Sequence, residues 1–585
     1  MNAPCNIAAA LPRLAAERPD QVALRCPGTR GPDGLARYDV ELTYAALDRR
    51  SDAIAAGLAR HGITRGTRTV VMVRPSPEFF LLMFALFKAG AVPVLVDPGI
   101  DKRALRQCLD EAQPQAFIGI PLAHLARRLL GWAKAAAVLI TTGRRPWLAD
   151  VTLAAVEQAG DGAGPQLADT APDDVAAILF TSGSTGVPKG VVYRHRHFVA
   201  QIELLGRAFG LQAGGVDLPT FPPFALFDPA LGLTSVIPDM DPTRPANADP
   251  RRLHDAIARF GVDQLFGSPA LVAVLARHGQ PLPTLRRVTS AGAPVPPDTV
   301  AALRALLPAD AQFWTPYGAT ECLPVAVVEG GELQATRAAT EAGAGTCVGR
   351  PVPPNEVRII AITDDAIAEW DQARVLGVGE VGEITVAGPT TTDTYFNREA
   401  QTRQAKIRER LMETAASGES VAPVATGFAA TIASTEGEAE SPGGARERIV
   451  HRMGDVGYFD AEGRLWFCGR KSHRVETLDG PLYTEQVEPA FNVHPQVRRT
   501  ALVGVAMGNT RPRYPVLCVE LAEGIPVREW PRIERELRDL AARHPHTARI
   551  SRFLRHKRFP VDIRHNAKIG REKLAVWAAQ QGVNA

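Results

Sequence analysis

Short runs of Val, Ile and Leu alternate along this chain with longer segments of helical pattern. Residues 68–73 and 91–96 are typical of strands and residues 78–88 of a helix between them, followed by a turn at 97–99. Further strand-like runs occur at 176–180, 264–266 and 287–289. Each run is short enough for a strand that is buried on both faces of a parallel sheet. The alternation therefore predicts an α/β fold, with parallel or mixed sheets wrapped by helices.

The chain is long enough to need more than one domain. Its 585 residues exceed the span over which a single hydrophobic core usually grows. The polar segment 469–472 follows the strand-like residues 465–468, and the apolar pattern restarts after it. This interruption predicts a large N-terminal domain over residues 1–470 and a smaller α+β C-terminal domain over residues 471–585.

A second interruption lies within the predicted N-terminal domain. Residues 408–447 are rich in Ala, Gly, Ser, Thr and Glu, a composition that cannot bury much apolar surface. We expect a surface insertion here, opening with a helix and otherwise mobile.

Composition narrows the class of protein. A formal net charge of +3, with basic residues dispersed rather than gathered in a stripe, argues against nucleic acid as a partner. The seven cysteines are scattered without C-x-x-C spacing, which argues against a zinc site and favours a reducing compartment. The N-terminus lacks the pattern of a signal peptide, and the strongest apolar run, 79–87, is far shorter than the roughly 20 residues of a membrane-spanning helix. We therefore expect a cytoplasmic protein without a transmembrane segment.

The most specific local motif is Thr-Ser-Gly-Ser-Thr-Gly-Val-Pro-Lys-Gly at 181–190, between strand-like residues 178–180 and 191–193. Its glycines let backbone N–H groups approach a ligand, its hydroxyls add donors, and its lysine offsets the charge of a polyphosphate. A Walker A loop would place Gly-Lys-Ser/Thr at the start of a helix, whereas here Pro188 precedes the lysine and a strand follows. The motif predicts a phosphate cradle of another kind.

Several motifs in a fixed order resemble the adenylate-forming superfamily of acyl-CoA synthetases, peptide-synthetase adenylation domains and firefly luciferase. The resemblance covers nearly the whole chain. More narrowly, residues 221–229 and 560–571 resemble the β-lactone synthetases of bacterial long-chain olefin biosynthesis. The motifs that carry the wider resemblance lie at 42–47, 181–190, 290–294, 317–321, 454–455, 469–470 and Lys568.

The resemblance implies ATP and Mg²⁺ as cofactors and assigns roles to individual residues. Lys568, Glu321, Thr185 and Lys189 are expected to act in the chemistry, and Glu321 to hold Mg²⁺ with a hydroxyl of Thr181 or Thr320. Lys471 corresponds to the hinge about which the mobile C-terminal domain turns. The expected nucleotide-binding residues are Thr181, Ser182, Gly183, Ser184, Gly186, Ala291, Gly292, Ala293, Pro294, Tyr317, Gly318, Thr320, Asp455 and Arg470.

Each of these residue types also has a simpler explanation. Tyr317 offers a flat ring for adenine, but it is also compatible with a core position. Glu321 is a hard oxygen ligand or one half of a surface ion pair. Asp455 lies near glycines, where an aspartate often forms a turn, although the family uses it to bind ribose. Lys568 is a solvated charge or the ammonium that bridges carboxylate and α-phosphate oxygens.

The sequence departs from the common acyl-CoA synthetase pattern at three places. Ala225 replaces a frequent histidine, residues 475–481 replace the turn that meets the thiol, and Ala567 replaces a glycine before the lysine. These differences favour a reaction in which no large thiol enters. We therefore expect a long-chain 2-alkyl-3-hydroxy acid to be activated as acyl-AMP, with its own hydroxyl then closing a β-lactone.

Three alternatives stay open at this point. A fatty-acyl-CoA ligase differs only in the second nucleophile, a non-catalytic nucleotide-binding protein would retain the cradle alone, and a peptide-synthetase module would need a carrier domain after Arg571. His195 and His197 follow the cradle and are expected to be structural. The olefin-pathway resemblance further implies assembly with the other enzymes of that route.

Overall fold

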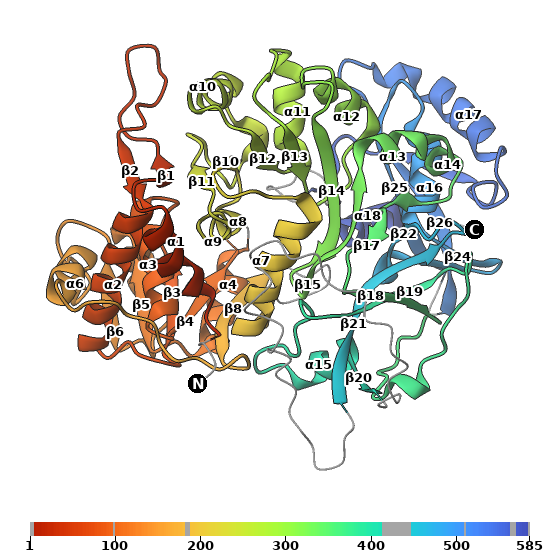
Figure 1. Cartoon of the computed structure of the whole chain (residues 1–585). Helices are drawn as coiled ribbons and strands as arrows, with labels where there is room; N and C mark the ends of the chain where they lie inside the picture. The colour runs from red at the N-terminus through yellow and green to blue at the C-terminus, as the bar shows by residue number, and fades with distance from the viewer. Residues whose placement is uncertain are drawn as a thin grey trace, which may run out of the picture.

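The computed structural model describes residues 5–97, 100–181, 188–411, 446–507, 510–561 and 569–582. Two large sheets and one medium-sized sheet form the body of the molecule, and a small sheet follows at the C-terminal end (Figure 1). Helices wrap the sheets, so the predicted α/β class is confirmed.

The first sheet has seven strands and is parallel except at one end. The predicted strand–helix–strand unit is present as β3, α3 (Pro77–Lys88) and β4, with β3 and β4 parallel. At the far edge β8 and β9 pair antiparallel and flank the cradle motif, with Thr181 opposite Lys189. The strand order is β7 (Val151–Thr152), β6 (Val138–Thr141), β5 (Ala116–Gly119), β3 (Arg68–Met72), β4 (Val92–Val96), β8 (Val175–Thr181) and β9 (Lys189–Arg194).

Helices cover both faces of this sheet. The apolar helix α3 is buried from Phe79 to its end and packs with α2 (Tyr44–Arg60) on one face. Buried side chains of α4 (Lys102–Ala112) pack on the opposite face, where Ala123 and Ala126 of α5 (Pro121–Leu130) join the same cluster. Lys88 at the end of α3 is buried but places Nζ 2.6 Å from carboxylate oxygens of both Asp48 and Asp52 of α2. A buried cation is therefore matched by two anions.

The second sheet has nine strands and is mixed. The strand-like runs at 264–266 and 287–289 become β12 and β13, and these two pair in parallel as expected. The strand order is β17 (Arg350–Pro351), β15 (Cys322–Glu329), β14 (Gln312–Ala319), β13 (Arg287–Ser290), β12 (Gln264–Gly267), β10 (Val216–Pro219), β11 (Thr234–Val236), β1 (Val22–Cys26) and β2 (Val40–Thr43).

The helices over this sheet start and stop at residues suited to those positions. In α10 (Pro250–Phe260) and α11 (Pro269–His278), Asp249 and Ser268 accept hydrogen bonds from the first turn and proline occupies the first helical position. Both helices end at a glycine in the left-handed region. The remaining helices of the body are α1 (Ala10–Glu17), α6 (Leu153–Gly160), α7 (His195–Phe209), α8 (Pro222–Ala225), α9 (Asp228–Leu231), α12 (Pro297–Arg304), α13 (Gly330–Ala335), α14 (Arg337–Glu341) and α15 (Glu399–Ala405).

The third sheet is antiparallel and contains the root of the predicted insertion. The expected helix at its start is wrong, because residues 408–411 belong to β20, which pairs with β21 from Lys406 opposite His451 to Leu411 opposite Arg446. Alternating buried and exposed side chains in β20 favour a strand. Residues 412–445 lie outside the described residues. The strands are β16 (Thr346–Cys347), β22 (Leu465–Arg470), β21 (Arg446–Phe459), β19 (Gly382–Ala387) and β18 (Glu356–Ile360), with β20 (Lys406–Leu411) beside β21.

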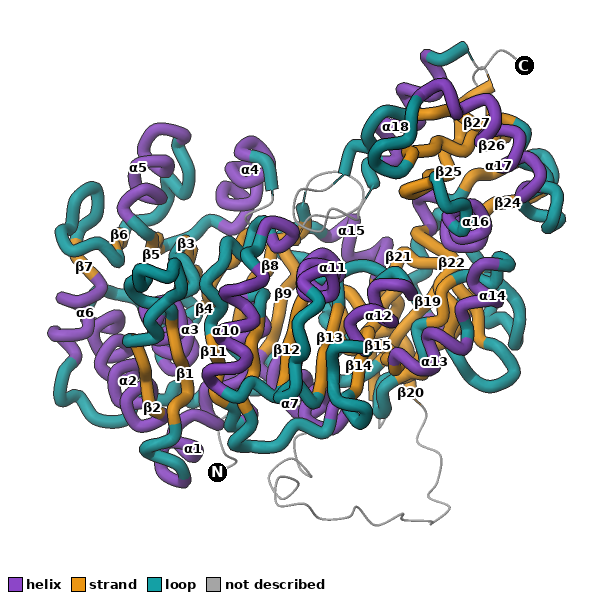
Figure 2. The backbone as a smooth tube through the Cα atoms, turned by 90° about the horizontal axis from the view of Figure 1, so that it is seen from above, coloured by secondary structure: helices purple, strands orange, loops and turns teal. Residues whose placement is uncertain are grey.

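The C-terminal elements lie together at one end of the molecule (Figure 2). Two apolar clusters, each made only of residues between 475 and 578, cover opposite faces of a three-stranded sheet. Within the described part of the chain, no helix is both long and apolar enough to cross a bilayer. The elements are β23 (Val475–Thr477), β24 (Gly480–Leu482), α16 (Thr484–Asn492), β25 (Val497–Met507), β26 (Thr510–Leu521), α17 (Trp530–Ala541), β27 (Arg552–Arg555) and α18 (Arg571–Gln580).

Candidate active site

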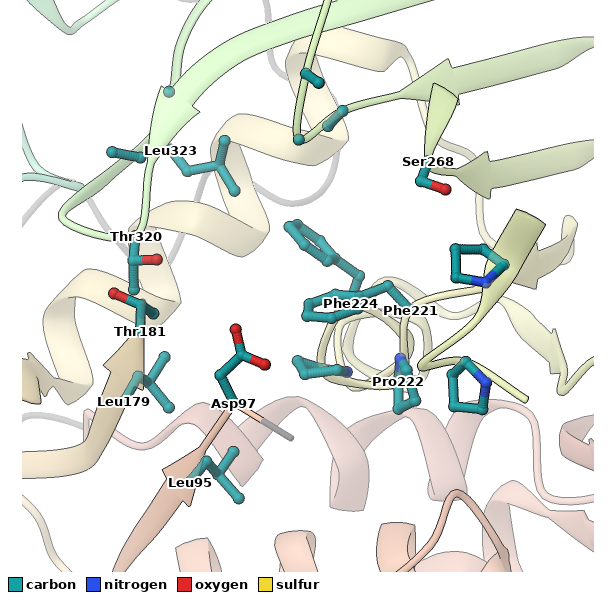
Figure 3. A pocket seen from close by; sticks show the side chains of 18 of the residues that line it. Leu95, Asp97, Leu179, Thr181, Phe221, Pro222, Phe224, Ser268, Thr320 and Leu323 are labelled. Atoms are coloured by element: carbon teal, nitrogen blue, oxygen red, sulfur yellow. The ribbon is translucent and has the colours of Figure 1, made fainter. Parts of the chain in front are cut away.

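A cleft of about 2330 Å³ runs along the ends of the first two sheets and reaches the C-terminal elements. The strand ends that meet there carry most of the predicted site residues, as expected for ligand sites of α/β sheets. Thr181 at the end of β8 and Thr320 after β14 turn toward one another, with Asp97 from the end of β4 nearby (Figure 3). Phe221, Pro222 and Phe224 face them across the cavity.

The predicted adenine-binding residues line this cleft from two neighbouring strands. Residues 291–294 follow β13, and Gly292 has φ of 98°, a conformation that favours glycine. Tyr317 and Gly318 lie in β14. Ser290 ends β13 with its hydroxyl oxygen buried and without a hydrogen-bond partner among the described residues. An unpaired buried hydroxyl is costly, and it suits a ligand that supplies a partner.

Asp455, Arg470 and Tyr317 form one linked group. Asp455 in β21 and Arg470 in β22 are cross-strand partners, and Arg470 Nη1 lies 2.8 Å from Asp455 Oδ1. The Tyr317 hydroxyl donates to Asp455 Oδ2 at 2.7 Å. Burial raises the pKa of Asp455, while the Arg470 charge and the Tyr317 hydroxyl oppose that rise. Burial and the adjacent Asp455 charge raise the pKa of Tyr317 well above its ordinary value.

This group retains capacity for a ligand. The Arg470 guanidinium balances the charge of the Asp455 carboxylate. The buried oxygen Asp455 Oδ1, however, accepts no hydrogen bond of good geometry from any described residue. A carboxylate oxygen of this kind can accept hydrogen bonds from a ribose hydroxyl. The simple turn-former explanation of Asp455 is excluded, since the residue lies inside a strand ladder.

Glu321 is held as an anion at the turn between β14 and β15. Tyr395 donates its hydroxyl to Glu321 Oε1 at 2.6 Å. Burial raises the pKa of Glu321, but the hydrogen bond from the Tyr395 hydroxyl and the charge of Lys406 oppose that rise, and the pKa of Glu321 lies below its ordinary value. Among the described residues, no group of three or more His, Cys, Asp and Glu is arranged to hold a metal. A cation bound by Glu321 would therefore need further ligands from hydroxyls or from a phosphate.

Two lysines lie close to the Tyr395 ring. Lys189 Nζ lies 4.8 Å from the ring centroid and Lys406 Nζ lies 5.8 Å from it. Burial lowers the pKa of Lys406 to about 8, against the opposing effect of Glu321 and Asp393. Lys406 Nζ also donates to the backbone oxygen and, at 3.2 Å, to the hydroxyl of Thr392. Positive charge is thus concentrated beside the predicted phosphate cradle.

His451 lies opposite Lys406 in the β20–β21 ladder and lines the cleft. Its Nδ1–H donates to the backbone oxygen of Ala405 at 3.1 Å, so Nε2 carries the lone pair. Burial lowers the pKa of His451 to about 3, with Lys406 adding to the effect. The imidazole is therefore neutral at pH 7.

Tyr395, Lys406 and His451 were not predicted from the sequence. Their one visible signal is the scarcity of lysine, with nine in the whole chain, which makes Lys406 a less routine residue than another arginine would be. The other two lack a motif, because their placement depends on the pairing of β20 with β21 and on the loop after β19.

Several predicted site residues lie outside the described residues, namely Ser182, Gly183, Ser184, Thr185, Gly186 and Lys568. Their roles remain predictions. The flanking residues Thr181 and Lys189 line the cleft, as do Val561, Ile569 and Gly570 on either side of the segment with Lys568.

His195 and His197 take structural positions, as expected. Both are buried at the start of α7, and burial lowers the pKa of His195 to about 4 and of His197 to about 3. His195 Nδ1 accepts from Ile7 N at 3.3 Å, and His197 Nδ1 accepts from Arg194 N at 3.0 Å. Neither residue lines the cleft.

Comparison with known proteins identifies the family. The model of the AMP-binding enzyme family matches residues 11–396. The chain belongs to this family. It is 74% identical over 579 residues to an olefin β-lactone synthetase of Xanthomonas campestris, covering 99% of this chain and 98% of the relative. A second olefin β-lactone synthetase, from Stenotrophomonas maltophilia, is 70% identical over 582 residues, covering 99% of both chains.

Solved structures agree on the fold of this AMP-binding enzyme. The amide bond synthetase McbA from Marinactinospora thermotolerans has a TM-score of 0.72 at 22% identity and covers 98% of this chain and 99% of its own. ATP-bound MatB from Rhodopseudomonas palustris has a TM-score of 0.73 at 18% identity and covers 99% of this chain and all of its own. The predicted fold class and family are confirmed.

Proposed function

We propose that this AMP-binding enzyme is an olefin β-lactone synthetase, using ATP to activate a long-chain 2-alkyl-3-hydroxy acid and then closing its β-lactone. The observation that carries the proposal is the 74% and 70% identity to two enzymes of that name over nearly the full chain. Ala225 supports it, because this fully buried residue stands in the cleft-lining segment 221–227 at the position where many acyl-CoA synthetases carry a gating histidine.

The first half of the reaction is an in-line displacement at the α-phosphorus. A carboxylate oxygen of the acid forms the new P–O bond, and the bond to pyrophosphate breaks, giving acyl-AMP and pyrophosphate. Asp455 and Arg470 hold the ribose, and residues 291–294 and Tyr317 hold adenine. The cations of Lys189 and Lys568 offset charge on the phosphates. Mg²⁺, held by Glu321 with Thr181 or Thr320, would neutralise further charge when bound.

The second half needs only the substrate itself. The oxygen of the 3-hydroxyl attacks the acyl carbon, the bond from that carbon to AMP oxygen breaks, and the hydroxyl proton is released. The products are a four-membered β-lactone and AMP. An internal hydroxyl is held at a high effective concentration, so no second substrate has to enter.

The test is product analysis with isotope labels. The chain is incubated with ATP, Mg²⁺ and a 2-alkyl-3-hydroxy acid that carries ¹⁸O in its carboxyl group, without coenzyme A. We expect AMP with one ¹⁸O atom and a lactone that retains one ¹⁸O in its carbonyl. A strict need for coenzyme A would favour a fatty-acyl-CoA ligase, and ADP as product would exclude adenylation.

A matched pair of variants tests the site. Glu321→Gln removes the charge expected to hold Mg²⁺ and should lower kcat by on the order of 10²–10³. Glu332→Gln removes a carboxylate of α13 that pairs with Arg350 away from the cleft, and it should leave kcat unchanged. Equal effects of the two substitutions would contradict the assignment of Glu321.

A further inference from the structure

Exposed apolar side chains gather at one place on this protein. Of the eleven large hydrophobic side chains that are exposed among the described residues, four fall within residues 122–147. Leu122 and Leu129 of α5 are 63% and 73% exposed, and they lie seven residues apart, on one face of the helix. Trp147 is 60% exposed, whereas the other six tryptophans are buried or half-buried. Such clustering on a soluble surface usually marks an interaction site.

The fold brings charged residues to the same edge. The strands β4, β5 and β6 are parallel, with β3 between β4 and β5, so the segments that follow β4, β5 and β6 emerge at one edge of the sheet. The start of α5 touches the loop after β6, since a Cβ at Gly143 would lie 2.6 Å from Pro121 Cγ. We call the following exposed residues the edge patch: Lys102, Arg103, Leu122, Arg144, Arg145 and Trp147.

The stretch that carries α5 and Trp147 has charged residues of one sign. Residues 112–149 contain five Lys and Arg residues and no Asp or Glu. None of the four cations of the edge patch forms an ion pair with a described residue, whereas most other arginines of the chain do. Unpaired cations beside exposed Leu and Trp are the combination that binds the headgroup region of an anionic bilayer.

The edge patch also lies at a mouth of the cleft. Leu122, Ala123 and Ala126 of α5 line the cleft, and so do Ile100 and Leu105 from the α4 side. Figure 2 shows α4 and α5 on the same side of the sheet. The apolar lining therefore continues from the region of Thr181 to an exposed leucine at the surface.

We propose that the edge patch docks this protein on an anionic lipid surface, with Trp147 and Leu122 entering the headgroup layer and the four cations contacting lipid phosphates. The docked orientation places the opening between α4 and α5 against the bilayer, so that a long-chain acid passes from lipid into the cleft. The docking claim stands on the surface alone, and the passage of a long-chain acid rests on the proposed function.

A lipid surface fits this patch better than a protein partner. Trp, Leu and Arg together match the graded polarity of a membrane interface, in which aromatic rings lie at headgroup depth and cations bind phosphate. The four exposed positive charges favour an anionic partner, and anionic phospholipids offer such charge without specific geometry. A protein partner is the alternative that the test below separates.

The test is flotation of the full-length protein with vesicles, without ATP or acid, so its result is independent of the proposed function. Vesicles of phosphatidylcholine alone are compared with vesicles that also contain phosphatidylglycerol. We expect binding to the anionic vesicles, and this binding should weaken as the salt concentration rises. Binding should also shift the tryptophan emission to shorter wavelength, and the shift should be smaller in the variant Trp147→Phe.

Variants locate the contact. Arg144→Glu combined with Arg145→Glu should lower the fraction bound at least about tenfold, because each basic residue contributes about a fivefold factor. Leu122→Glu should also weaken binding. Leu478→Glu changes a side chain that is 84% exposed in the C-terminal region and serves as the matched control. Thermal melting should be unchanged in all of them.

Two outcomes overturn the proposal. The first is no binding to anionic vesicles, which would reassign the patch to a protein partner. The second is binding that Leu478→Glu reduces as much as Leu122→Glu, which would place the lipid contact elsewhere.

Discussion

A single hydroxyl group links the expected adenine platform to the expected ribose ligand. Tyr317 donates to Asp455 Oδ2 at 2.7 Å, so the tyrosine is both a flat ring and the support of a buried carboxylate. The sequence suggested each residue separately. The bond between them depends on β14 and β21 approaching in space, which no local pattern encodes.

Removing that hydroxyl should shift the pH dependence of nucleotide use. The Tyr317 bond stabilises the ionised form of Asp455, so Tyr317→Phe raises the pKa of Asp455 further. We expect the acid limb of kcat/KM for ATP to move to higher pH and KM for ATP to rise about tenfold or more, as for a lost hydrogen bond to a charged group. Tyr458→Phe, a half-buried tyrosine bonded to Ala344 O away from the cleft, is the control. An unchanged acid limb in Tyr317→Phe would refute the coupling.

A second buried pair makes stability depend on pH. Asp217 in β10 and Asp228 in α9 are both buried, and Ser235 donates to Asp228 at 2.7 Å. Burial, then the nearby Asp263 carboxylate, raises the pKa of Asp217 to about 7, and burial with the Asp217 charge raises that of Asp228 well above its ordinary value. The folded state therefore binds protons more tightly than the unfolded state. This contribution to stability is complete below pH 3.8 and is lost as pH rises to about 7.

Asp217→Asn should remove much of that pH dependence. At pH 8 the substitution removes a buried negative charge, and we expect Tm to rise by roughly 2 °C or more. At pH 4 the wild-type pair is already neutral, so the two proteins should melt alike. Differential scanning calorimetry at both pH values decides this, and an equal change in Tm at pH 4 and pH 8 would rule out a role for ionisation.

At the scale of elements, the regular strands and helices were predictable and the irregular ones were not. The unit β3–α3–β4 and the strands β8, β9, β12 and β13 follow directly from apolar periodicity, since their side chains are buried on both faces. The start of the predicted insertion was expected to be helical, whereas residues 408–411 belong to β20, a strand of only six residues rich in charge. Its pairing with β21 is a long-range contact. Lys406 and His451 reach the site only through that pairing.

Lys406 should act as a positioning residue through the loop after β19. Its ammonium binds Thr392, and Thr392 donates both its N–H, at 2.9 Å, and its hydroxyl, at 3.0 Å, to the backbone oxygen of Glu321. Lys406→Met keeps the length of the side chain and removes these bonds. We expect kcat/KM for ATP to fall about tenfold or more. Burial already lowers the pKa of Lys406 to about 8, so replacing this costly buried charge by an apolar group should leave Tm little changed.

The control for Lys406→Met is Lys134→Met, which removes an exposed lysine that does not line the cleft. It should change neither kcat/KM nor Tm. A fall in Tm of Lys406→Met that parallels its loss of activity would indicate a structural role alone.

At the scale of the whole molecule, one cleft draws its lining from both ends of the chain. The cleft is lined by strand ends of the first two sheets and also by residues of α18 and its preceding loop. Lys471, the expected hinge, is tied to the body, since its Nζ lies 3.0 Å from Glu383 and 3.0 Å from Thr363 O. Arg452 pairs with the same buried Glu383 at 2.6 Å. The polar interruption at 469–472 predicts a domain boundary, but no sequence pattern there predicts the contacts of Lys471 with Glu383 and Thr363.

The domain boundary predicted at residue 471 can be tested by autonomous folding. The two C-terminal clusters include only residues from Val475 onward, and β25 and β26 alternate their buried side chains between them. A fragment of residues 471–585 should therefore unfold cooperatively and give a dispersed NMR spectrum. A fragment that starts at residue 484 lacks Val475 and Leu482 of the first cluster, so it should lose that cooperativity. If the 471–585 fragment stays unfolded, then the packing of Tyr483 against Val456 and Cys468 of the body is required for folding. The two parts of the chain would then fold as one unit.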